Sequence, residues 1–346
     1  MGELVSIIIT TYRGNNNLVR AIESAQQQDY PSIEIIVVDD NDPDTEARKI
    51  TEELINAYSN TTPKFPVNYI KHSHNMNGAT ARNTGVANCK GKYIQLLDDD
   101  DVLFPSKISK SVKAIEESGL DGVLTRVACC SGSNIVSISG SCASIGLADK
   151  RAELMVVPDF LGTGSNIFVR TDAYRELDGF DTSFLRMQDL EFMMRFFRKH
   201  KCAMLDEILI IKADNDRKIV YTDYQRQIGF KQRFWDKFMS DLKESMTEKQ
   251  YYDYFNLEYT HLFRIALMNR SKTDLNEAVK NLQGIRPLSK KESLFVKMHS
   301  AYVVLHKSRF LVEWVRSLRY KGEKAPSEIV AISKEVRNYI TSIIGE

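Results

Sequence analysis

Four consecutive carboxylates occupy one point of the chain. Asp98, Asp99, Asp100 and Asp101 directly follow the run Tyr93–Leu97, whose aromatic and aliphatic side chains predict a buried strand. Two carboxylates about 4 Å apart repel by roughly 4 kcal/mol at an effective dielectric near 20, and a divalent cation relieves that repulsion. Carboxylate oxygens suit Mg²⁺ or Mn²⁺. Because ligands in open α/β sheets bind beyond the carboxyl ends of the strands, we expect a metal or phosphate site here; a solvated acidic turn is the alternative.

Asp39 and Asp40 form a second acidic strand end, and the pattern around both predicts a parallel sheet. The first predicted strand lacks polar alternation, as a strand does when both faces of a parallel sheet are covered. The predicted strands are Leu4–Thr10, Ile33–Val38, Val67–Lys71 and Tyr93–Leu97. Helical spacing separates them over Leu18–Gln28, from Pro43 to Tyr58, and over Thr80–Cys89. This alternation predicts an α/β, Rossmann-like sheet that is mostly parallel and flanked by helices.

The pattern continues to about residue 220 and then changes. Helices are predicted from Pro105 to Ser118, from Thr171 to Gly179 and over Asp189–Lys199, with strands at Gly122–Ala128, Gly164–Val169 and Ala203–Lys212. Residues 131–147, rich in Ser and Gly, predict short strands joined by turns. From Tyr221 onward, aromatic and aliphatic residues recur at helical spacing. We therefore expect an α/β domain over 1–220 and an all-helical C-terminal domain over 221–346.

Composition excludes several classes of protein. The 346 residues are 43% hydrophobic and 27% charged, as in ordinary globular proteins. Cysteines number five, an odd count without Cys-x-x-Cys spacing, which argues against a disulfide framework or a zinc site. No apolar run approaches 18 residues, and the first residues lack a signal-peptide pattern. The expected location is the cytoplasm, at most peripheral at the inner face of the membrane.

Two nucleotide-binding motifs are missing from the sequence. No Gly-x-Gly-x-x-Gly follows the first strand, which argues against a dinucleotide dehydrogenase. Gly85–Lys92 resembles a P-loop, but five residues separate Gly85 from Gly91, and Tyr93 stands where Ser or Thr is required. What remains is a pair of acidic strand ends without a phosphate-cradling loop. A nucleotide-sugar site needs such parts, because a metal must neutralise the departing diphosphate.

The first half of the chain resembles the family 2 glycosyltransferases, which are inverting enzymes of the GT-A fold. Six segments in the family's order carry the resemblance and span about residues 4 to 212: Val5–Tyr12, Val37–Asp40, Ala81–Gly85, Leu96–Asp101 with Pro105, Gly179–Phe184 and Gln188–Arg195.

The resemblance implies a set of nucleoside and diphosphate contacts. Thr10, Tyr12 and Asp40 match nucleoside contacts, with Asp40 accepting a hydrogen bond from uracil. Asp39 is either a further nucleotide contact or a structural residue. Arg82 matches a diphosphate-side arginine, with an ion pair to a strand-end Asp as the alternative.

The resemblance also assigns the acidic run. Asp98, Asp99 and Asp100 cover the family's DxD motif: Asp98 faces sugar or ribose, Asp99 belongs to the nucleotide-sugar contacts, and Asp100 together with Asp98 binds Mn²⁺ or Mg²⁺. Asp101 either caps the following helix or joins the site.

Asp189 matches the family's catalytic base, a carboxylate that takes the proton of the acceptor hydroxyl. The family usually has Glu-Asp at this point, whereas Gln188 precedes Asp189 here, so the usual acceptor contact is altered. Gly164 and Ser165 lie where relatives line the acceptor pocket. Glu191 is interpreted as structural.

A second departure from the family follows the last predicted strand. Many relatives carry a metal-binding His there, but Asp214, Asn215 and Asp216 include none. Either acid could substitute, or water and phosphate could complete the site. Arg217 and Lys218 either close over the diphosphate or are solvated. His72 and His74 are interpreted as surface residues.

The C-terminal part is basic, with 22 Lys and Arg against 15 Asp and Glu from Tyr221 onward. The segment Lys290–Lys321 holds eight Lys and Arg interleaved with aromatic and aliphatic residues. Such a helix either lies on an anionic membrane surface or packs on its neighbours with a solvated basic face. No nucleic-acid module is present, so nucleic acid is not an expected partner.

The predicted function is transfer of a sugar from a UDP-sugar, with inversion, to a hydroxyl of a glycan or lipid-linked acceptor, assisted by a metal and by Asp189. A non-catalytic nucleotide-sugar-binding protein and a nucleotidyltransferase are the alternatives. A nucleotidyltransferase would need a Gly-rich, basic loop after the first strand, where the chain offers only Arg13 and Gly14.

Overall fold

The computed structural model describes residues 2–13, 17–140, 149–157, 159–213, 223–269, 271–305 and 334–344. The chain forms two compact units. Met1–Asp216 and Ser327–Glu346 make the first, and Arg217–Pro326 make the second. This division differs from the expected boundary at the C-terminal end, because helix α14 (Lys334–Ile344) belongs to the α/β unit rather than to the helical one.

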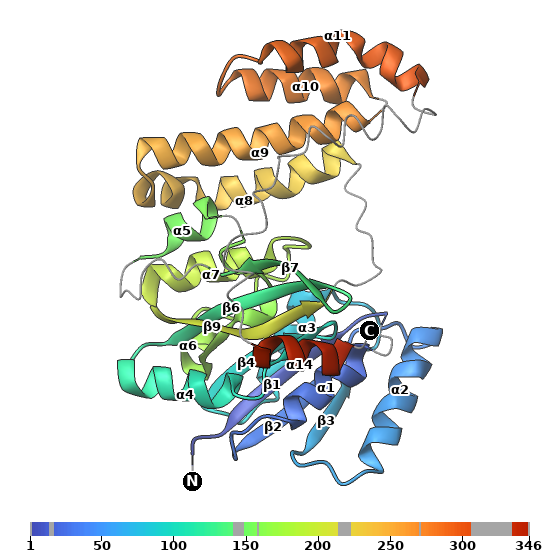
Figure 1. Ribbon diagram of the computed structural model, residues 1–346, viewed down its shortest axis with the longest axis vertical. Helices are drawn as coiled ribbons and strands as arrows, with labels where there is room; N and C mark the ends of the chain where they lie inside the picture. The colour runs from blue at the N-terminus through green and yellow to red at the C-terminus, as the bar shows by residue number, and fades with distance from the viewer. Residues whose placement is uncertain are drawn as a thin grey trace. The chain divides into compact units, whose positions relative to one another are not determined.

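Within the described residues, the first unit contains one mixed sheet of nine strands in the order β3-β2-β1-β4-β8-β6-β9-β5, with β7 paired to β6 (Figure 1). Strands β1 to β4 run parallel to one another, β8 is antiparallel to β4 and β6, and β5 is antiparallel to β9. This arrangement confirms the α/β class. The strands are β1 Val5–Thr11, β2 Ile33–Asp39, β3 Val67–Lys71, β4 Tyr93–Asp98, β5 Asp101–Leu103, β6 Gly122–Ser131, β7 Asn134–Ser139, β8 Phe168–Arg170 and β9 Cys202–Ala213.

Helices cover both faces of the parallel part of the sheet. One face packs its Val and Ile side chains against the apolar stripes of α1 and α4, and this forms the main core. On the other face α3 approaches β1 closely at Gly85, where a Cβ atom would lie 2.2 Å from Ile8 Cγ2. Only glycine fits there, and the close approach sets the position of Arg82 one turn earlier on α3. The helices are α1 Asn17–Gln26, α2 Glu46–Ser59, α3 Gly78–Ala87, α4 Lys107–Ser118, α5 Arg151–Val156, η1 Gly164–Asn166, α6 Thr171–Glu176 and α7 Gln188–Lys199.

Several local predictions were wrong. The segment Gly164–Val169 is not one strand but the 3₁₀ turn η1 followed by β8, because Thr163 caps the turn through a bond from Ser165 N. Pro43 precedes α2 rather than lying in its first turn, since the Thr45 side chain caps that helix at Arg48 N. The short elements β5 and α5 were not predicted.

Helix α14 packs on the edge of the sheet formed by β5, β6 and β9. Ile340 is fully buried there among Val102, Ala128 and Ile211. The hydroxyl of Tyr339 donates to the carbonyl oxygen of Leu103 at 2.9 Å, and its ring stands edge-on to Phe104 at 4.8 Å. The C-terminal helix therefore holds β5, which at three residues has little pairing of its own.

The second unit is helical, as predicted, over its described residues. Its helices are α8 Tyr224–Ser245, α9 Glu248–Met268, α10 Lys272–Gln283 and α11 Lys290–Leu305. The core between α8 and α9 is aromatic, and the buried Trp235 donates its indole N–H to Tyr254 Oη at 3.0 Å. The segment Lys290–Lys321 is described only as far as α11. No helix in the described part of the chain has both the length and the apolarity to span a bilayer.

The core of the first unit contains a buried lysine, Lys107, that has no acidic partner among the described residues. Lys107, at the start of α4, is fully buried and donates to Ser111 Oγ at 3.2 Å, while its ammonium lies 5.6 Å from the centre of the Phe168 ring. Burial lowers the pKa of Lys107 to about 7. The group is therefore half deprotonated near neutral pH, in contrast to an ordinary lysine.

We predict that Lys107→Met stabilises the protein, most strongly at or below pH 7. Between pH 7 and about 10.5 the unfolded chain keeps a proton that folded Lys107 has lost, so wild-type stability should rise with pH across this window. Below pH 7 the cost of burying the charge is fully present, and Lys107→Met should remove about 3 kcal/mol of it. Urea unfolding at pH 6 and pH 9 measures both effects.

The control is Lys113→Met, which removes an exposed lysine of the same helix that pairs with Glu117. It should change the unfolding free energy by less than about 0.5 kcal/mol at either pH. A stability gain for Lys107→Met that is equal at pH 6 and pH 9 would contradict the lowered pKa.

Candidate active site

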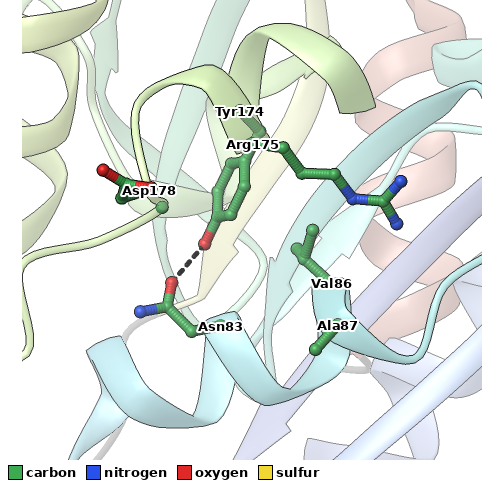
Figure 2. A pocket seen from close by; sticks show the side chains of 7 residues that line it. Asn83, Val86, Ala87, Tyr174, Arg175 and Asp178 are labelled. Atoms are coloured by element: carbon green, nitrogen blue, oxygen red, sulfur yellow. Dashed lines mark hydrogen bonds between the residues drawn. The ribbon is translucent and has the colours of Figure 1, made fainter.

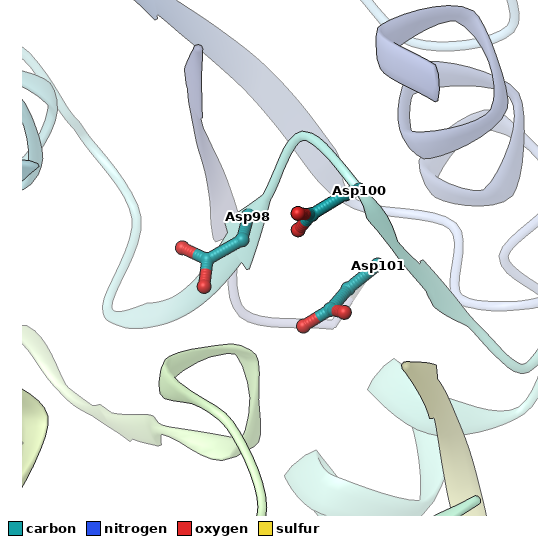
Figure 3. Close-up of side chains that lie close together, drawn as sticks. All are labelled: Asp98, Asp100 and Asp101. Atoms are coloured by element: carbon teal, nitrogen blue, oxygen red, sulfur yellow. The ribbon is translucent and has the colours of Figure 1, made fainter. Parts of the chain in front are cut away.

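Three carboxylates of the acidic run point into one space. Asp98 ends β4, Asp101 begins β5, and Asp100 lies in the turn between them (Figure 3). One ligand oxygen from each lies within 4.8 Å of the others. The chain reverses direction here because β5 leaves β4 to pair with β9, and this turn brings Asp98 and Asp101 together. The geometry fits a hard divalent cation bound through oxygen.

Asp101 is the buried member of the cluster. Its Oδ2 accepts hydrogen bonds from Thr163 Oγ1 at 2.6 Å and Ser165 Oγ at 2.7 Å. Burial and the charges of Asp98 and Asp100 raise the pKa of Asp101 to about 8, although the two hydroxyls oppose the shift. The idea that Asp101 caps the following helix was wrong, because it lies in β5 and α4 begins only at Lys107.

Ser165 and Gly164 lie against this cluster. Ser165 is fully buried and also accepts a hydrogen bond from Asp98 N at 2.9 Å, so one hydroxyl joins both strand ends. A Cβ at Gly164 would stand 3.4 Å from Arg82 Nη2 and 3.7 Å from Asp98 Oδ2. Asp99, by contrast, lies outside the cluster: it is buried and accepts from Thr11 Oγ1 at 2.7 Å.

Arg82 connects the acidic cluster to the start of α7. Its Nη2 donates to Asp98 Oδ1 at 2.5 Å and its Nη1 donates to Gln188 Oε1 at 3.1 Å, while its guanidinium stacks 5.4 Å from the centre of the Phe180 ring. Burial acts against the charge of Arg82, but Asp98 and, more weakly, Asp189 raise its pKa overall. The ion pair that was the alternative role for Arg82 is therefore formed. Through its second hydrogen bond, Arg82 also holds Gln188 beside the candidate metal ligands.

Asp189 lies in the first turn of α7, half-buried. The buried apolar face of α7, which includes Phe192 and Phe196, anchors the helix. Glu191 is fully buried and ion-pairs with Arg195, which in turn donates to the Leu177 and Gly179 carbonyls. This bonding supports the structural interpretation of Glu191.

The second acidic strand end is extensively bonded. Asp39 forms an ion pair with Arg48 at 3.0 Å and accepts from Tyr69 Oη and from both the backbone and side-chain N–H groups of Asn41. Asn41 also accepts from Arg13 N at 2.7 Å, which ties the loop after β1 to the loop after β2. Asp39 is completely buried, so its contacts account for a structural role.

Asp40 is held by the loop after β3. His72 Nδ1 lies 2.7 Å from Asp40 Oδ1, which also accepts from Met76 N, and Asn75 Nδ2 donates to Oδ2 at 2.9 Å. The other ring nitrogen of His72 lies 2.9 Å from Thr84 Oγ1. The interpretation of His72 as a surface residue was wrong, because it is 8% exposed; His74 is exposed as predicted.

At the end of β1, Thr10 lies level with Val38 and Asp98 on the neighbouring strands. Tyr12 follows in the loop and is 37% exposed, with the Arg13 guanidinium 5.1 Å from the centre of its ring. The structure thus brings Thr10, Asp98, Asp100, Arg82 and Gln188 to one edge of the sheet. Asp214–Lys218 lie outside the described residues.

Comparison with known proteins assigns the family. Residues 6–177 match the model of glycosyl transferase family 2. The chain belongs to this family. Over 114 residues it is 36% identical to an Escherichia coli enzyme named UDP-Glc:alpha-D-GlcNAc-diphosphoundecaprenol beta-1,3-glucosyltransferase WfaP, covering 33% of this chain and 42% of that protein. The chain spans 29% to 74% of the length of the uncharacterized Rickettsia glycosyltransferases that it matches.

Solved structures support the GT-A fold. S. aureus TarS 1-349 in complex with UDP-GlcNAc aligns with a TM-score of 0.52 and 15% identity, covering 86% of this chain and 92% of that one. The mannosyltransferase PcManGT from Pyrobaculum calidifontis, in complex with GDP-Man and Mn²⁺, aligns with a TM-score of 0.52 and 16% identity, covering 91% and 83%. These likenesses confirm the predicted fold class of this glycosyltransferase.

Three further residues of the glycosyltransferase lie near the acidic cluster, although nothing in the sequence singled them out. Thr163 binds Asp101, Thr11 holds Asp99, and Lys212 lies opposite Asp101 across the β5–β9 pair. Thr163 belongs to no motif, and Thr11 lies in the segment Val5–Tyr12 but had no role of its own there. Lys212 could have been found only from the register of β5, a strand that is too short to predict.

A pocket of about 300 Å³ lies between α3 and α6, and none of its lining residues belongs to the acidic cluster (Figure 2). Asn83 forms part of its lining and accepts from Tyr174 Oη at 2.6 Å. Asn83 also bonds both the N–H and the carbonyl of Phe180. Because Phe180 stacks against Arg82, this wall helps to fix the arginine that joins Asp98 to Gln188. The pocket is lined by Asn83, Val86, Ala87, Tyr174, Arg175, Asp178 and Gly179.

We predict that Asp39→Asn destabilises the protein without changing nucleotide affinity. The substitution leaves Arg48, which is buried with a side chain 6% exposed, without its charged partner, and such losses cost about 3–5 kcal/mol. The double variant Asp39→Asn/Arg48→Met should recover part of this loss. Urea unfolding measures stability and calorimetry with UDP measures affinity; reduced UDP affinity at wild-type stability would instead make Asp39 a nucleotide contact.

Proposed function

We propose that this glycosyltransferase moves a sugar from a UDP-sugar, with inversion, to a hydroxyl of a lipid-linked or glycan acceptor. Residues 1–220 would form its catalytic domain, completed by α14. The observation that carries the proposal is the connection made by Arg82. One side chain bonds both Asp98 in the acidic cluster and Gln188, the residue next to Asp189. A donor site and a candidate base thus share a wall, as transfer to an adjacent hydroxyl requires.

The donor set of Asp98, Asp100 and Asp101 supports a resident Mg²⁺ or Mn²⁺. Carboxylate oxygens are preferred by both cations, and Asp101 enters the set beyond the two acids expected from the sequence. When bound, the cation would neutralise the charge that develops on the diphosphate as it leaves. The Mn²⁺ in the archaeal mannosyltransferase complex is consistent with this proposal.

The nucleoside would lie at the ends of β1 and β2. Thr10 and Tyr12 would flank it, and Asp40 would accept from the base. Among the described residues, His72, Met76 N and Asn75 bond the Asp40 carboxylate, which has about four acceptor positions, so a uracil N–H would take a fourth. Asp99 would support the nucleoside site indirectly, because it holds Thr11 by a hydrogen bond. The name of the Escherichia coli relative and the TarS complex support UDP over other nucleotides.

Asp189 would act as the general base. It lies in the first turn of α7, and the Arg82–Gln188 bond holds the preceding residue against the proposed donor site. The proton of the acceptor hydroxyl would pass to its carboxylate as the oxygen attacks the anomeric carbon. Gln188 offers an amide where relatives have a second acid, and Gly164 lies beside Arg82 and Asp98, where the absence of a side chain would let the sugar approach them.

The acceptor is proposed to be a saccharide on a lipid carrier at the cytoplasmic face of a membrane. The name of the Escherichia coli relative includes such an acceptor. In this chain, the exposed side chains of α11 include Leu294 and Met298, one turn apart, with Lys290, Lys291 and Lys297 beside them. Apolar groups flanked by lysines favour contact with anionic lipid. A non-catalytic nucleotide-sugar-binding protein remains the competing class, and the turnover assay below separates the two.

We predict that Asp100→Ala strongly lowers the affinity for Mn²⁺, because one of three ligand oxygens is lost. Calorimetric titration of Mn²⁺ into the full chain without nucleotide measures this directly. Asp99→Asn is the matched control: Asp99 belongs to the same acidic run but lies outside the cluster, so its Mn²⁺ affinity should fall by no more than the about three- to tenfold that one nearby charge contributes, and far less than in Asp100→Ala. Equal losses in both variants would speak for a diffuse charge effect instead of a site.

We predict that Asp189→Asn lowers turnover by about 10²- to 10⁴-fold, the usual contribution of a general base. UDP release from UDP-glucose and UDP-GlcNAc, measured with diphosphate-lipid and free saccharide acceptors, gives the rate. UDP affinity should not change, because the nucleotide contacts lie on other residues, and stability should hold because Asn is isosteric and tolerated near helix N-termini. Near wild-type turnover would exclude Asp189 as the base.

A further inference from the structure

Lys212 on β9 stands directly opposite Asp101 on β5 in their antiparallel pair. Residues opposite each other in such a pair carry their side chains to the same face of the sheet, with Cβ atoms about 4.5–5.5 Å apart. The register therefore puts a lysine on the same side as the innermost carboxylate of the cluster.

Lys212 and Asp101 hold the same loop. The Lys212 ammonium donates to the carbonyl oxygen of Gly162 at 3.0 Å. The next residues of that loop, Thr163 and Ser165, donate their hydroxyls to Asp101. Gly162 has φ +78°, and a Cβ there would lie 2.9 Å from a Val127 methyl, so the loop has a defined path that presents its carbonyl to the lysine.

The charges around Lys212 are predominantly negative. Partial burial lowers its pKa, but Asp101 and, more weakly, Asp189 and Asp98 raise the pKa overall, so the ammonium stays protonated among carboxylates. The acids of the site are Asp98, Asp100, Asp101 and Asp189, and the cations are Arg82 and Lys212. A bound cation requires ionised ligands, Asp101 included, and the four acids and two bases would then together carry two negative charges, which one divalent cation balances.

We propose that Lys212 is a positioning residue of the donor site, a fixed positive charge that limits the acidic cluster to one divalent cation and favours the donor's diphosphate beside it. This inference rests on the proposed function. Arg82 is engaged by Asp98 and Gln188, whereas Lys212 meets the cluster through Asp101 on a different strand. The two cations therefore act on different members of the cluster.

Loss of Lys212 should change Mn²⁺ affinity in opposite directions, depending on whether Lys212 acts through its charge or only supports the Gly162 loop. Removing a positive charge near a cation site should tighten Mn²⁺ binding, because less repulsion opposes the metal. The same change should weaken UDP binding, because the diphosphate loses an attraction. If Lys212 only anchored the Gly162 loop, its loss would loosen the cluster and weaken both.

The experiment uses the full chain with Lys212→Met, Lys212→Arg and the distant control Lys113→Met. For Lys212→Met we expect Mn²⁺ alone to bind about three- to tenfold more tightly, and UDP at saturating Mn²⁺ to bind about three- to tenfold more weakly, by calorimetry at low salt. Lys212→Arg keeps the charge and should match wild type in both affinities. Lys113→Met, exposed and paired with Glu117, should change neither.

Each other outcome has a separate meaning. Joint weakening of Mn²⁺ and UDP binding in Lys212→Met, or unchanged binding of both, overturns the charge role while leaving the proposed function intact. Loss of the effect at high salt is expected, because exposed charges are screened. A wild-type chain that binds UDP but no Mn²⁺ overturns both this inference and the proposed metal site.

Discussion

Repulsion among the carboxylates at the end of β4 is the constraint on which the site depends. Four consecutive acids cannot share one small volume, and the structure separates them. Asp99 turns inward to Thr11, while Asp101 is buried under two hydroxyls and Asp98 takes Arg82. The chain reversal into β5 keeps Asp98, Asp100 and Asp101 together. Such an arrangement opposes folding by itself, so the surrounding core must hold it in place.

Rigid supports therefore surround the charged groups. The loop from Gly162 to Ser165 is fastened to Asp101 on one side and, through Ser165 Oγ, to Asp98 N on the other. Behind Arg82, Asn83 fixes Phe180 with two backbone bonds. At the end of β2, Arg48 and Asp39 form a buried pair, which is costly to break although it adds little net stability. Each support uses hydrogen bonds to backbone, which place side chains more accurately than apolar packing alone.

The sequence was most informative where local chemistry decides the structure. Strands β1, β2 and β4 are mostly apolar runs that end in polar residues, so their identity and the acidic ends of β2 and β4 followed directly. Pairing between strands that lie far apart in the sequence could not be predicted. β5 exists because three residues find β9 about 110 positions later, and the partnership of Asp101 with Thr163 depends on that pairing. His72 looked like a loop residue because its burial comes from Asp40 and Thr84, on two other segments. The same holds for α14, whose apolar face gave no indication of which unit it covers.

The position of α14 affects the order in which the parts of the protein fold during translation. The strand that carries Asp101 is clamped by Tyr339 and Ile340, yet 110 residues of the helical unit, Arg217–Pro326, are synthesised between β9 and the end of the chain. During translation, the first unit emerges with β5 uncovered and Val102 and Ile211 open to water. The helical unit can fold in the meantime from contacts close in sequence, whereas the acidic turn gains its last support only when α14 leaves the ribosome. A nascent chain thus acquires the framework around Asp39 and Asp40 early, and the support of the acidic turn by α14 comes later.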